Sequence, residues 1–360
     1  MKTFLTFLAL LAAVFVPGPA PEKTPAPDPA PARAGRVEAV VNREYLPLVL
    51  EMIAGSRERI EFLQLEFHYD PEVKQIQDAL RAALARGVKV RGLLEDNISF
   101  NRTSARYLNQ FGIETKLDTP EKMLHNKLFI FDRNRVLLGS TNLSGNSLRN
   151  NNETNLRVDD PRIGAFFGRY FDQLWGDSNR EPQEVAPVEL PEIKTVVNRQ
   201  HFPELISLLD GGRRRIWVVM YGMSYNERYP GSHPNRLIEA LGQAARRGVD
   251  VRVILDRSDY NEGINRVNDE TSERLGKTGV KVRFDREDVT THAKLVIVDE
   301  KAMVGSANWG YQAMDVRNES SLLVQDKAVV EDLTRYFLEM WDEGTFTGTP
   351  APTPFPTPGT

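Results

Sequence analysis

A short segment of this chain occurs twice, once in each half. The first copy, HNKLFIFDRNRVLLGSTN, begins at His125, and the second, HAKLVIVDEKAMVGSAN, begins at His292. Each copy contains His-x-Lys, an Asp seven residues after the His, and Gly-Ser-x-Asn. One match would carry little weight in a chain of 360 residues, whereas two copies in the same order indicate an internal duplication. The chain is therefore expected to fold as two related halves.

A second repeated segment supports the duplication. Val-Val-Asn-Arg occurs at 40–43 and again at 196–199, and each copy is followed four residues later by a proline. The offset between the copies grows from 156 at Val41 to 167 at His125, so the second half carries small insertions. One insertion lies in the Pro/Gly-rich stretch 225–235, which predicts a loop.

Strand and helix patterns alternate in each half. Runs of apolar, β-prone residues predict strands. Two segments with helical periodicity begin with a proline, and each ends just before a glycine, Gly87 or Gly248. The predicted pairs are strands 59–67 and 216–223, helices 71–86 and 234–247, strands 88–94 and 249–255, and closing helices 166–175 and 329–341.

This alternation predicts an α/β fold. We expect two similar α/β sandwich lobes, with mixed sheets covered by helices and the site at the lobe interface. Lobe 1 is placed at 36–180 and lobe 2 at 192–344, joined by a Pro-punctuated linker at 181–191.

The two ends of the chain have a different composition. Residues 1–20 contain a Lys and a short apolar run, typical of a secretory signal peptide, so we expect a secreted or periplasmic protein. An uncleaved membrane anchor is the alternative. The Pro/Ala-rich stretch 21–35 is expected to be a disordered tether, and the Pro/Thr-rich stretch 345–360 a disordered tail.

Composition excludes some chemistry. The chain has no cysteine, which rules out disulfides and cysteine ligands for zinc. The net charge of −4 argues against a generally basic, DNA-coating surface, but it does not exclude a local basic groove. Hydrophobic residues make up 41 %, enough for a globular core.

Strand geometry groups the repeated polar residues. Side chains alternate between the two faces of a strand, so His125 and Lys127 share one face, as do His292 and Lys294. Asp132 and Asp299 have the opposite parity and are expected to stabilise turns near the site through basic groups or backbone. His68, His201 and His233 lie outside the repeats and are expected to have structural roles.

The Gly-Ser-x-Asn segments are predicted on the return strands beside the histidines. Glycine permits close approach of backbone to a ligand, and Ser140, Ser306, Asn142 and Asn308 can supply neutral donors. Of these, we expect Ser140 and Ser306 to be structural residues near the site. Trp309 is a candidate for the substrate entrance, and burial at the lobe interface is the alternative.

A glutamate follows each motif, Glu153 in the first half and Glu319 in the second. A carboxylate bonded to one imidazole nitrogen would select the tautomer and leave the other nitrogen for substrate. These groups describe phosphodiester chemistry without metal or cofactor. One neutral histidine attacks phosphorus, the other protonates the leaving alcohol, and the lysines and asparagines bind the phosphoryl oxygens. Which histidine is the nucleophile stays open at this point.

With these residues, the chain resembles the phospholipase D superfamily, whose mark is a duplicated H-x-K-x4-D with a trailing G-S-x-N. The resemblance covers about 37–344. It implies two α/β lobes around one shared site and a metal-independent mechanism through a phosphohistidine. It also implies paired catalytic histidines, phosphate-binding lysines and asparagines, and carboxylates that orient the histidines, at the eight positions named above.

Members of this family act on different substrates. Our leading expectation is an exported phosphoric diester hydrolase that converts phospholipids to phosphatidate and a free headgroup alcohol. The alternatives are a nonspecific nuclease acting on DNA or RNA, a phosphatidyltransferase resembling cardiolipin synthases, and a binding protein with a decayed site. Family cardiolipin synthases typically carry transmembrane helices, which ranks that alternative low. We expect a phospholipid or membrane surface as partner and, since both half-sites lie in one chain, a monomer.

Overall fold

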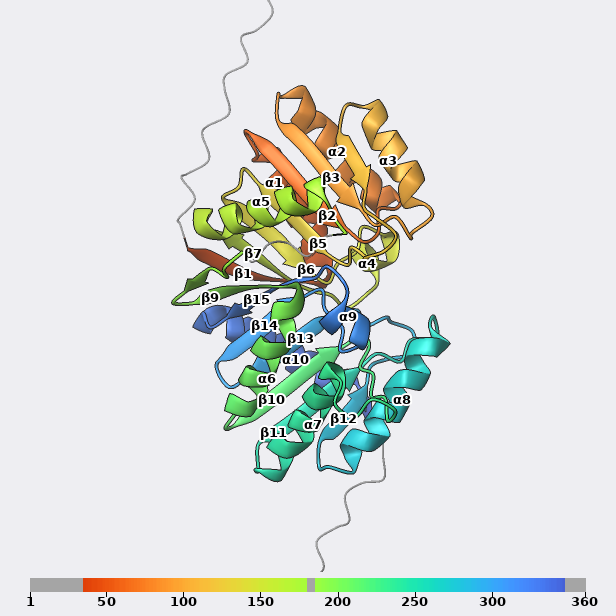
Figure 1. The fold of residues 1–360 in the computed structure, drawn as a ribbon, viewed down its shortest axis with the longest axis vertical. Helices are drawn as coiled ribbons and strands as arrows, with labels where there is room; N and C mark the ends of the chain where they lie inside the picture. Colours follow the sequence, from red (N-terminus) through yellow and green to blue (C-terminus); the bar gives the residue numbers. More distant parts are fainter. Residues whose placement is uncertain (1–34, 180–184, 347–360) are drawn as a thin grey trace, which may run out of the picture. The chain divides into compact units, whose positions relative to one another are not determined.

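A computed structural model of the protein describes residues 35–179 and 185–346 (Figure 1). In the first half, strands and helices alternate up to the middle and a helix closes the half. The elements are β1 (Arg36–Val41), α1 (Tyr45–Ala54), β2 (Arg59–Gln64), α2 (Pro71–Ala85), β3 (Lys89–Leu94), α3 (Asn101–Gln110), β4 (Glu114–Leu117), β5 (Lys127–Phe131), β6 (Arg135–Gly139), α4 (Gly145–Arg149), β7 (Thr154–Asp159) and α5 (Pro161–Gly176).

The second half repeats this order with a short strand added at each end. Its elements are β8 (Glu189–Leu190), β9 (Ile193–Val197), α6 (His201–Gly211), β10 (Arg215–Met220), α7 (His233–Arg246), β11 (Asp250–Leu255), α8 (Glu262–Gly276), β12 (Lys281–Phe284), β13 (Lys294–Val298), β14 (Lys301–Gly305), α9 (Tyr311–Asp315), β15 (Ser320–Val324), α10 (Lys327–Glu343) and β16 (Thr345–Phe346).

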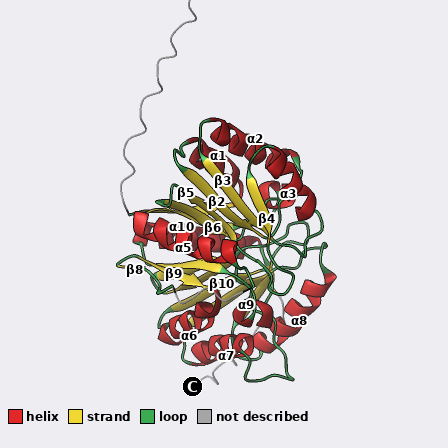
Figure 2. Cartoon of the chain, turned by 45° about the horizontal axis from the view of Figure 1, so that its top comes forward, coloured by secondary structure: helices red, strands yellow, loops and turns green. Residues whose placement is uncertain are grey.

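The two sheets have the same topology. The first runs β1-β7-β6-β5-β2-β3-β4. From the matching edge, the second runs β8-β9-β15-β14-β13-β10-β11-β12-β16, so it has the same order with β8 and β16 added at its edges. In each, three neighbouring strands are parallel, β2-β3-β4 and β10-β11-β12, and the remaining neighbours are antiparallel. This confirms the prediction of an α/β fold with two similar mixed sheets covered by helices (Figure 2).

Local sequence explains the ends of the elements. Pro71 opens α2, where its missing N–H costs no hydrogen bond, and Gly87 follows the helix with a φ of 90°, which favours glycine. The first predicted strand, 59–67, is longer than the observed one, because β2 ends at Gln64. Beyond it the Leu65 N–H donates to the Asn126 carbonyl (3.0 Å), so the chain leaves the sheet just where the first histidine segment begins.

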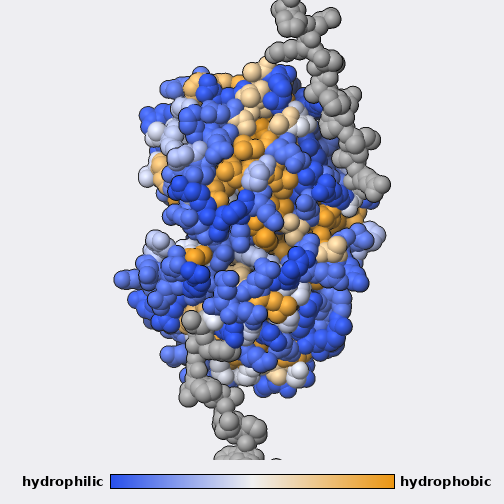
Figure 3. All heavy atoms as spheres, turned by 180° about the vertical axis from the view of Figure 1, so that it is seen from behind, coloured by the Kyte–Doolittle hydropathy of each residue, from blue (hydrophilic) through white to orange (hydrophobic). Residues whose placement is uncertain are grey.

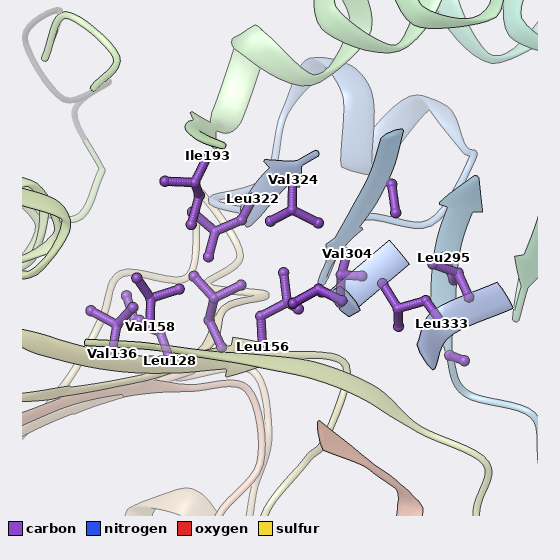
Figure 4. Close-up of a cluster of buried hydrophobic side chains, with 14 of the residues drawn as sticks. Leu128, Val136, Leu156, Val158, Ile193, Leu295, Val304, Leu322, Val324 and Leu333 are labelled. Carbon is purple, nitrogen blue, oxygen red and sulfur yellow. The ribbon is translucent and has the colours of Figure 1, made fainter. Parts of the chain in front are cut away.

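Each sheet is covered differently on its two faces. One face of the first sheet packs against α1, α2, α3 and α4, and one face of the second packs against α6, α7, α8 and α9, each around its own apolar cluster. The opposite faces of both sheets contribute to a single cluster together with α5 and α10. In Figure 4, Leu128, Val136, Leu156 and Val158 of the first sheet face Leu322, Val324 and Ile193 of the second.

The shared cluster changes the expected role of the closing helices. The sequence placed one helix at the end of each lobe, and α5 and α10 do close the two halves. Their apolar faces, however, contribute to a core that both halves complete. Burying this common surface holds the two halves together, and the described residues form one compact unit.

The predicted boundaries need two corrections. Thr345–Phe346, placed in the C-terminal tail, pair with β12 as β16, and Glu189–Leu190, placed in the linker, pair with β9 as β8. Both pairs extend an existing sheet edge, which satisfies backbone groups there. The predicted signal peptide at 1–20, the tether at 21–35 except Gly35, and the tail beyond Phe346 lie outside the described residues.

The surface combines hydrophilic and apolar side chains. On the face turned away in Figure 1, hydrophilic side chains surround an apolar patch on the upper half (Figure 3). Among helices in the described ranges, none has the length and apolar character required to cross a membrane.

Candidate active site

The two repeated histidines lie just before central strands of the two sheets. His125 precedes β5 and His292 precedes β13, each by two residues. The His125 N–H donates to the Asn318 carbonyl, and the His292 N–H donates to the Asn152 carbonyl, both at 2.9 Å. Each acceptor belongs to the other half and directly precedes the glutamate of that half. The two histidine segments therefore meet at the lobe interface.

The histidines and glutamates pair across the two halves. His125 Nδ1 lies 3.0 Å from Glu319 Oε2, and His292 Nδ1 lies 3.1 Å from Glu153 Oε2. We call His125 with Glu319 the first dyad and His292 with Glu153 the second dyad. The sequence predicted a carboxylate on each imidazole but did not indicate that each half supplies it to the other.

This pairing determines which imidazole nitrogen can act. In both dyads Nδ1 faces a carboxylate, so Nδ1–H donates and Nε2 is left for chemistry. Both glutamates are fully buried, and the side chains of His125 and His292 are 6 % and 10 % exposed. A water-poor site strengthens each electrostatic interaction within it.

The two motif lysines are also buried beside the dyads. Lys127 Nζ donates to the His125 carbonyl (2.8 Å), and Lys294 Nζ donates to the His292 carbonyl. Burial lowers the pKa of Lys127 to about 8 and that of Lys294 to about 7, although the nearby glutamates oppose the shift. A phosphodiester anion between them would restore the charged form.

The environments of both histidines lower the imidazole pKa, but to different degrees. Burial, Lys127 and Arg317 together hold the pKa of His125 well below its ordinary value. Burial and Lys294 also lower the pKa of His292, but Glu153 opposes them through its charge and its hydrogen bond. His125 is therefore the more strongly neutral imidazole, and His292 is better supported as an imidazolium.

The glutamates show the matching difference. Burial alone would raise the pKa of Glu153, but His292, Lys294 and the Ser140 hydroxyl together lower it. For Glu319, burial outweighs Lys127 and the Ser306 hydroxyl, and its pKa is raised. The second dyad thus has the more stable carboxylate charge.

The motif asparagines retain unused hydrogen-bonding capacity. Asn142 and Asn308 follow β6 and β14, and the side-chain Oδ1 of each is buried without a hydrogen-bond partner among the described residues. A buried amide without partners is costly unless a ligand satisfies it. Both amides can therefore serve bound phosphoryl oxygens, through the amide NH₂ after rotation of the group.

Comparison with known proteins agrees with this arrangement. The family model described as "Cardiolipin synthase, PLD-like domain" matches residues 49–175 and 205–341, which include both motifs. The chain belongs to the phospholipase D superfamily. Both halves of the match carry a complete set of His, Lys and Asn, so the superfamily assignment rests on the whole site.

Similar proteins include enzymes named for phospholipids. Cardiolipin synthase B of Escherichia coli K12 is 25 % identical over 334 residues, covering 81 % of this chain and 77 % of that protein. Mouse mitochondrial cardiolipin hydrolase is 30 % identical over 159 residues, covering 44 % of this chain and 63 % of that protein. Phosphatidylserine synthase of Haemophilus influenzae has a similar fold, with a TM-score of 0.69 at 13 % identity over 86 % of this chain and 87 % of that chain.

The glycines and serines of the superfamily motif make contacts inside the protein. A side chain at Gly139 or Gly305 would collide with the neighbouring strand, so these glycines permit close strand packing. The Ser140 hydroxyl donates to Glu153 (2.5 Å), and the Ser306 hydroxyl donates to Glu319. Both serines therefore hold the dyad carboxylates.

The motif aspartates lie away from the dyads. Asp132 accepts hydrogen bonds from the backbone N–H groups of residues 57–59, and Asp299 accepts from those of residues 213–215. Both aspartates have a φ of 51°, at the turns after β5 and β13. They tie each turn to the start of the adjacent strand, β2 or β10.

Trp309 does not line an entrance. It is 1 % exposed and belongs to the apolar cluster of the second half alone, away from the shared core. Its backbone pairs with the segment after β10, since the Trp309 N–H donates to the Gly222 carbonyl (3.0 Å). This pairing draws the large ring into the core, so both interpretations of Trp309 from sequence were wrong.

The sequence missed residues that follow the parallel strands. The Tyr221 ring lies edge-on to His292 with centroids 4.9 Å apart, and Lys294 Nζ lies 5.0 Å from the same ring. At the matching edge of the first half, His68 Nε2 contacts Glu66 (3.2 Å), and Glu66 interacts with Lys127. Their position at the carboxyl ends of parallel strands was the available signal.

Buried carboxyl groups hold the backbone just before each histidine. In the first half, Glu95 and Asp118 both accept the Leu124 N–H, at 2.5 and 3.1 Å. In the second half, Asp256 accepts the Thr291 N–H (2.6 Å) and Asp285 accepts the Thr291 hydroxyl. We call these the first and second carboxyl pairs. Within the described ranges, no three His, Asp or Glu side chains are grouped as a metal ion would require.

Proposed function

We propose that this chain transfers phosphatidyl groups between phospholipid headgroup alcohols, as a cardiolipin-forming enzyme would. The observation that carries the chemistry is the pair of crossed dyads in one buried site. The alignment with cardiolipin synthase B supports the substrate, because it extends over 81 % of the chain and hence over both halves. We expected hydrolysis from the sequence, and the relatives favour transfer.

In the first step, the lone pair of His125 Nε2 attacks phosphorus. The bond from phosphorus to the leaving headgroup oxygen breaks, and His292 donates its Nε2 proton to that oxygen. A phosphohistidine and a free alcohol result. Lys127, Lys294 and the two motif asparagines stabilise the charge on the nonbridging oxygens.

In the second step, an acceptor hydroxyl loses its proton to neutral His292 Nε2 and attacks phosphorus. The phosphorus–nitrogen bond breaks and its electron pair returns to His125, which restores the free enzyme. Assigning attack to His125 follows from its cationic surroundings, because Lys127 and Arg317 oppose its protonation. Glu153 supports the charge that His292 must carry.

Transfer and hydrolysis share the first step and differ only in the acceptor. Burial of the histidines and lysines favours an acceptor that binds and displaces water over water itself. The acceptor in our proposal is the glycerol hydroxyl of a second phosphatidylglycerol, so a phospholipid surface is the partner. Export of the protein remains part of the same proposal.

The test offers the purified full chain vesicles of phosphatidylglycerol in the presence of EDTA. Cardiolipin, free glycerol and phosphatidate are then quantified by mass spectrometry. We expect cardiolipin and glycerol in equal amounts, because each transfer releases one glycerol. Formation of phosphatidate and glycerol without cardiolipin would replace transfer by hydrolysis.

Two control reactions sharpen this test. Plasmid DNA in the same buffer examines the nuclease alternative, and nicking without lipid turnover would overturn the phospholipid proposal. A His125→Asn variant should form neither cardiolipin nor phosphatidate. Cardiolipin from that variant would indicate a contaminating activity or a different site.

A further inference from the structure

The repeated Val-Val-Asn-Arg segments lie outside the motif that defines the superfamily, yet they contact both dyad glutamates. Asn42 and Asn198 directly follow β1 and β9 with φ of 51° and 48°, a left-handed conformation that a residue other than glycine adopts at a cost. Two matching strained positions in a duplicated fold indicate a common task.

Each asparagine is bonded to a glutamate in both directions. The Asn42 N–H donates to the Glu153 carbonyl (3.1 Å), while the Glu153 N–H donates to Asn42 Oδ1 (2.8 Å). Asn198 and Glu319 repeat the pattern at 3.1 and 2.9 Å. The asparagine therefore holds the backbone from which the dyad carboxylate projects.

A tyrosine from the other half completes each contact. The Tyr336 hydroxyl, on α10, donates to Asn42 Oδ1 (3.1 Å), and the Tyr170 hydroxyl, on α5, donates to Asn198 Oδ1 (2.9 Å). Both tyrosines are buried in the shared core. Because a backbone N–H can only donate, the accepting atom of each amide is its oxygen, and the two donors together orient it.

The arginine of each segment restrains the loop that leads to the glutamate. Arg43 donates to the carbonyls of Asn150 (2.8 Å) and Asn151, and Arg199 donates to the carbonyl of Arg317. Asn151 and Arg317 stand two residues before their respective glutamates. Both polar residues of the repeat thus act on the same short stretch of backbone.

We propose that Asn42 with Tyr336 and Asn198 with Tyr170 are positioning residues that aim Glu153 and Glu319 at the histidines of the opposite half. The contact between the halves is thereby coupled to the orientation of both imidazoles. α10, from the second half, sets Glu153 and through it His292. α5, from the first half, sets Glu319 and through it His125.

The test removes one hydroxyl at a time. Tyr336→Phe should lower kcat roughly ten-fold on phosphatidylglycerol vesicles with little change in KM. A misoriented imidazole slows the chemical step and leaves substrate binding unchanged. Tyr170→Phe should do the same through the first dyad. Tyr225→Phe is the matched control, because its hydroxyl is bonded to Glu239 (2.9 Å) and Arg274 (2.6 Å), and neither belongs to a dyad.

A readout without substrate separates this inference from the proposed function on which it rests. The chain has five histidines, so the imidazole nitrogen NMR signals can be assigned individually. Tyr336→Phe should shift the signals of His292 and leave those of His125 in place, and Tyr170→Phe should do the reverse. This pattern can appear even if phosphatidylglycerol is not the substrate.

Backbone-compatible variants and a double-mutant cycle complete the design. Asn42→Gly and Asn198→Gly keep the left-handed φ and remove the amide, and each should reproduce the signal shift of its tyrosine partner. In a Glu153→Gln background, Tyr336→Phe should have no further effect on kcat, while in a Glu319→Gln background its effect should persist. If both tyrosine variants match Tyr225→Phe in kcat and in the histidine signals, the positioning role is wrong.

Discussion

The two dyads have the same geometry but different electrostatic surroundings. Burial, Lys127, Arg317 and Lys294 lower the pKa of His125, whereas burial, Lys294 and Lys127 lower that of His292 less strongly. In the second dyad, Glu153 favours protonation of His292 and is itself held ionised. A duplicated scaffold therefore supplies two imidazoles in equivalent positions whose neighbours differ.

Aromatic contacts add to this difference. Tyr221 packs edge-on against His292, whereas the residue at the equivalent position of the first half, Leu65, is aliphatic. Behind the glutamates, Glu319 interacts with the buried His201, while Glu153 interacts with Tyr45 at the equivalent place. The asymmetry thus extends through the neighbours of both histidines and both glutamates.

The largest expected effect separates the tasks of the two histidines. His125→Asn and His292→Asn should each reduce turnover of phospholipid at least roughly 10,000-fold. With bis(p-nitrophenyl) phosphate, whose leaving group needs no acid, His292→Asn should still release about one nitrophenolate per enzyme and retain a phosphohistidine. His125→Asn should show no such burst.

A stopped-flow absorbance trace measures this burst, and His233→Asn serves as the control because His233 lies outside both dyads. A burst from His125→Asn and none from His292→Asn would reverse the assignment. Equal bursts from both would mean that the two half-sites are interchangeable.

The glutamates should differ in the same sense. Glu153→Gln should lower kcat roughly 1,000-fold, because the imidazolium of His292 loses its counter-charge, whereas Glu319→Gln should cost roughly ten-fold, since neutral His125 needs only an acceptor for Nδ1–H. Loss of the Glu153 charge also lowers the pKa of His292, so the alkaline decline in kcat should begin at lower pH. Steady-state rates across pH measure both effects, and equal losses would contradict the comparison.

The crossed pairing marks the limit of what the sequence could predict. Parity along β5 and β13 placed each His with its Lys, and the spacing to Glu153 and Glu319 identified the carboxylates. The origin of each carboxylate depends on how two whole sheets pack, which a pattern within one half does not contain. Such long-range packing is decided by the shared apolar core.

The same limit explains the errors at individual residues. Trp309 follows a motif residue in sequence, but backbone pairing with Gly222 turns it into the core. Asn42 and Asn198 were noticed only as a repeat, because their partners lie more than a hundred residues away. The fold class needed local periodicity alone, and was predicted correctly.

The lysines provide a smaller, pH-dependent comparison. The pKa values of about 7 for Lys294 and about 8 for Lys127 mean that the free enzyme loses these charges in succession as pH rises. The decline of kcat/KM should steepen above about pH 7 and again above about pH 8, and Lys294→Arg should remove the first step because guanidinium stays charged. In kcat the steps should move to higher pH, since bound phosphate favours the ammonium form.

Rates of bis(p-nitrophenyl) phosphate cleavage at low and saturating concentration give the two profiles. Lys301→Arg on the exposed start of β14 is the matched control and should leave both profiles unchanged. An unaltered first step in Lys294→Arg would remove Lys294 from phosphate binding.

The carboxyl pairs extend the comparison from rate to stability. Burial and Glu95 raise the pKa of Asp118 to about 8, while burial raises that of Asp256 to about 6, where Thr291 and Ser258 donate hydrogen bonds. After burial, the charge of Glu95 is the largest cause of the raised pKa of Asp118, whereas Asp285 is the smallest of the causes at Asp256, so Asp256 keeps its charge more readily. Both folded-state values lie above the ordinary value of 3.8.

The sign of the stability effect follows from proton uptake. A folded state that keeps a proton which the unfolded chain has released loses stability as pH rises between the two pKa values. The melting temperature should thus fall with pH from about 4 to about 8 through Asp118, and only to about 6 through Asp256. Asp118→Asn should reduce the slope over the whole interval and Asp256→Asn only over its acidic part, as measured by calorimetry. If the two variants flatten the same interval, the first and second carboxyl pairs titrate alike, and the asymmetry is confined to the dyads.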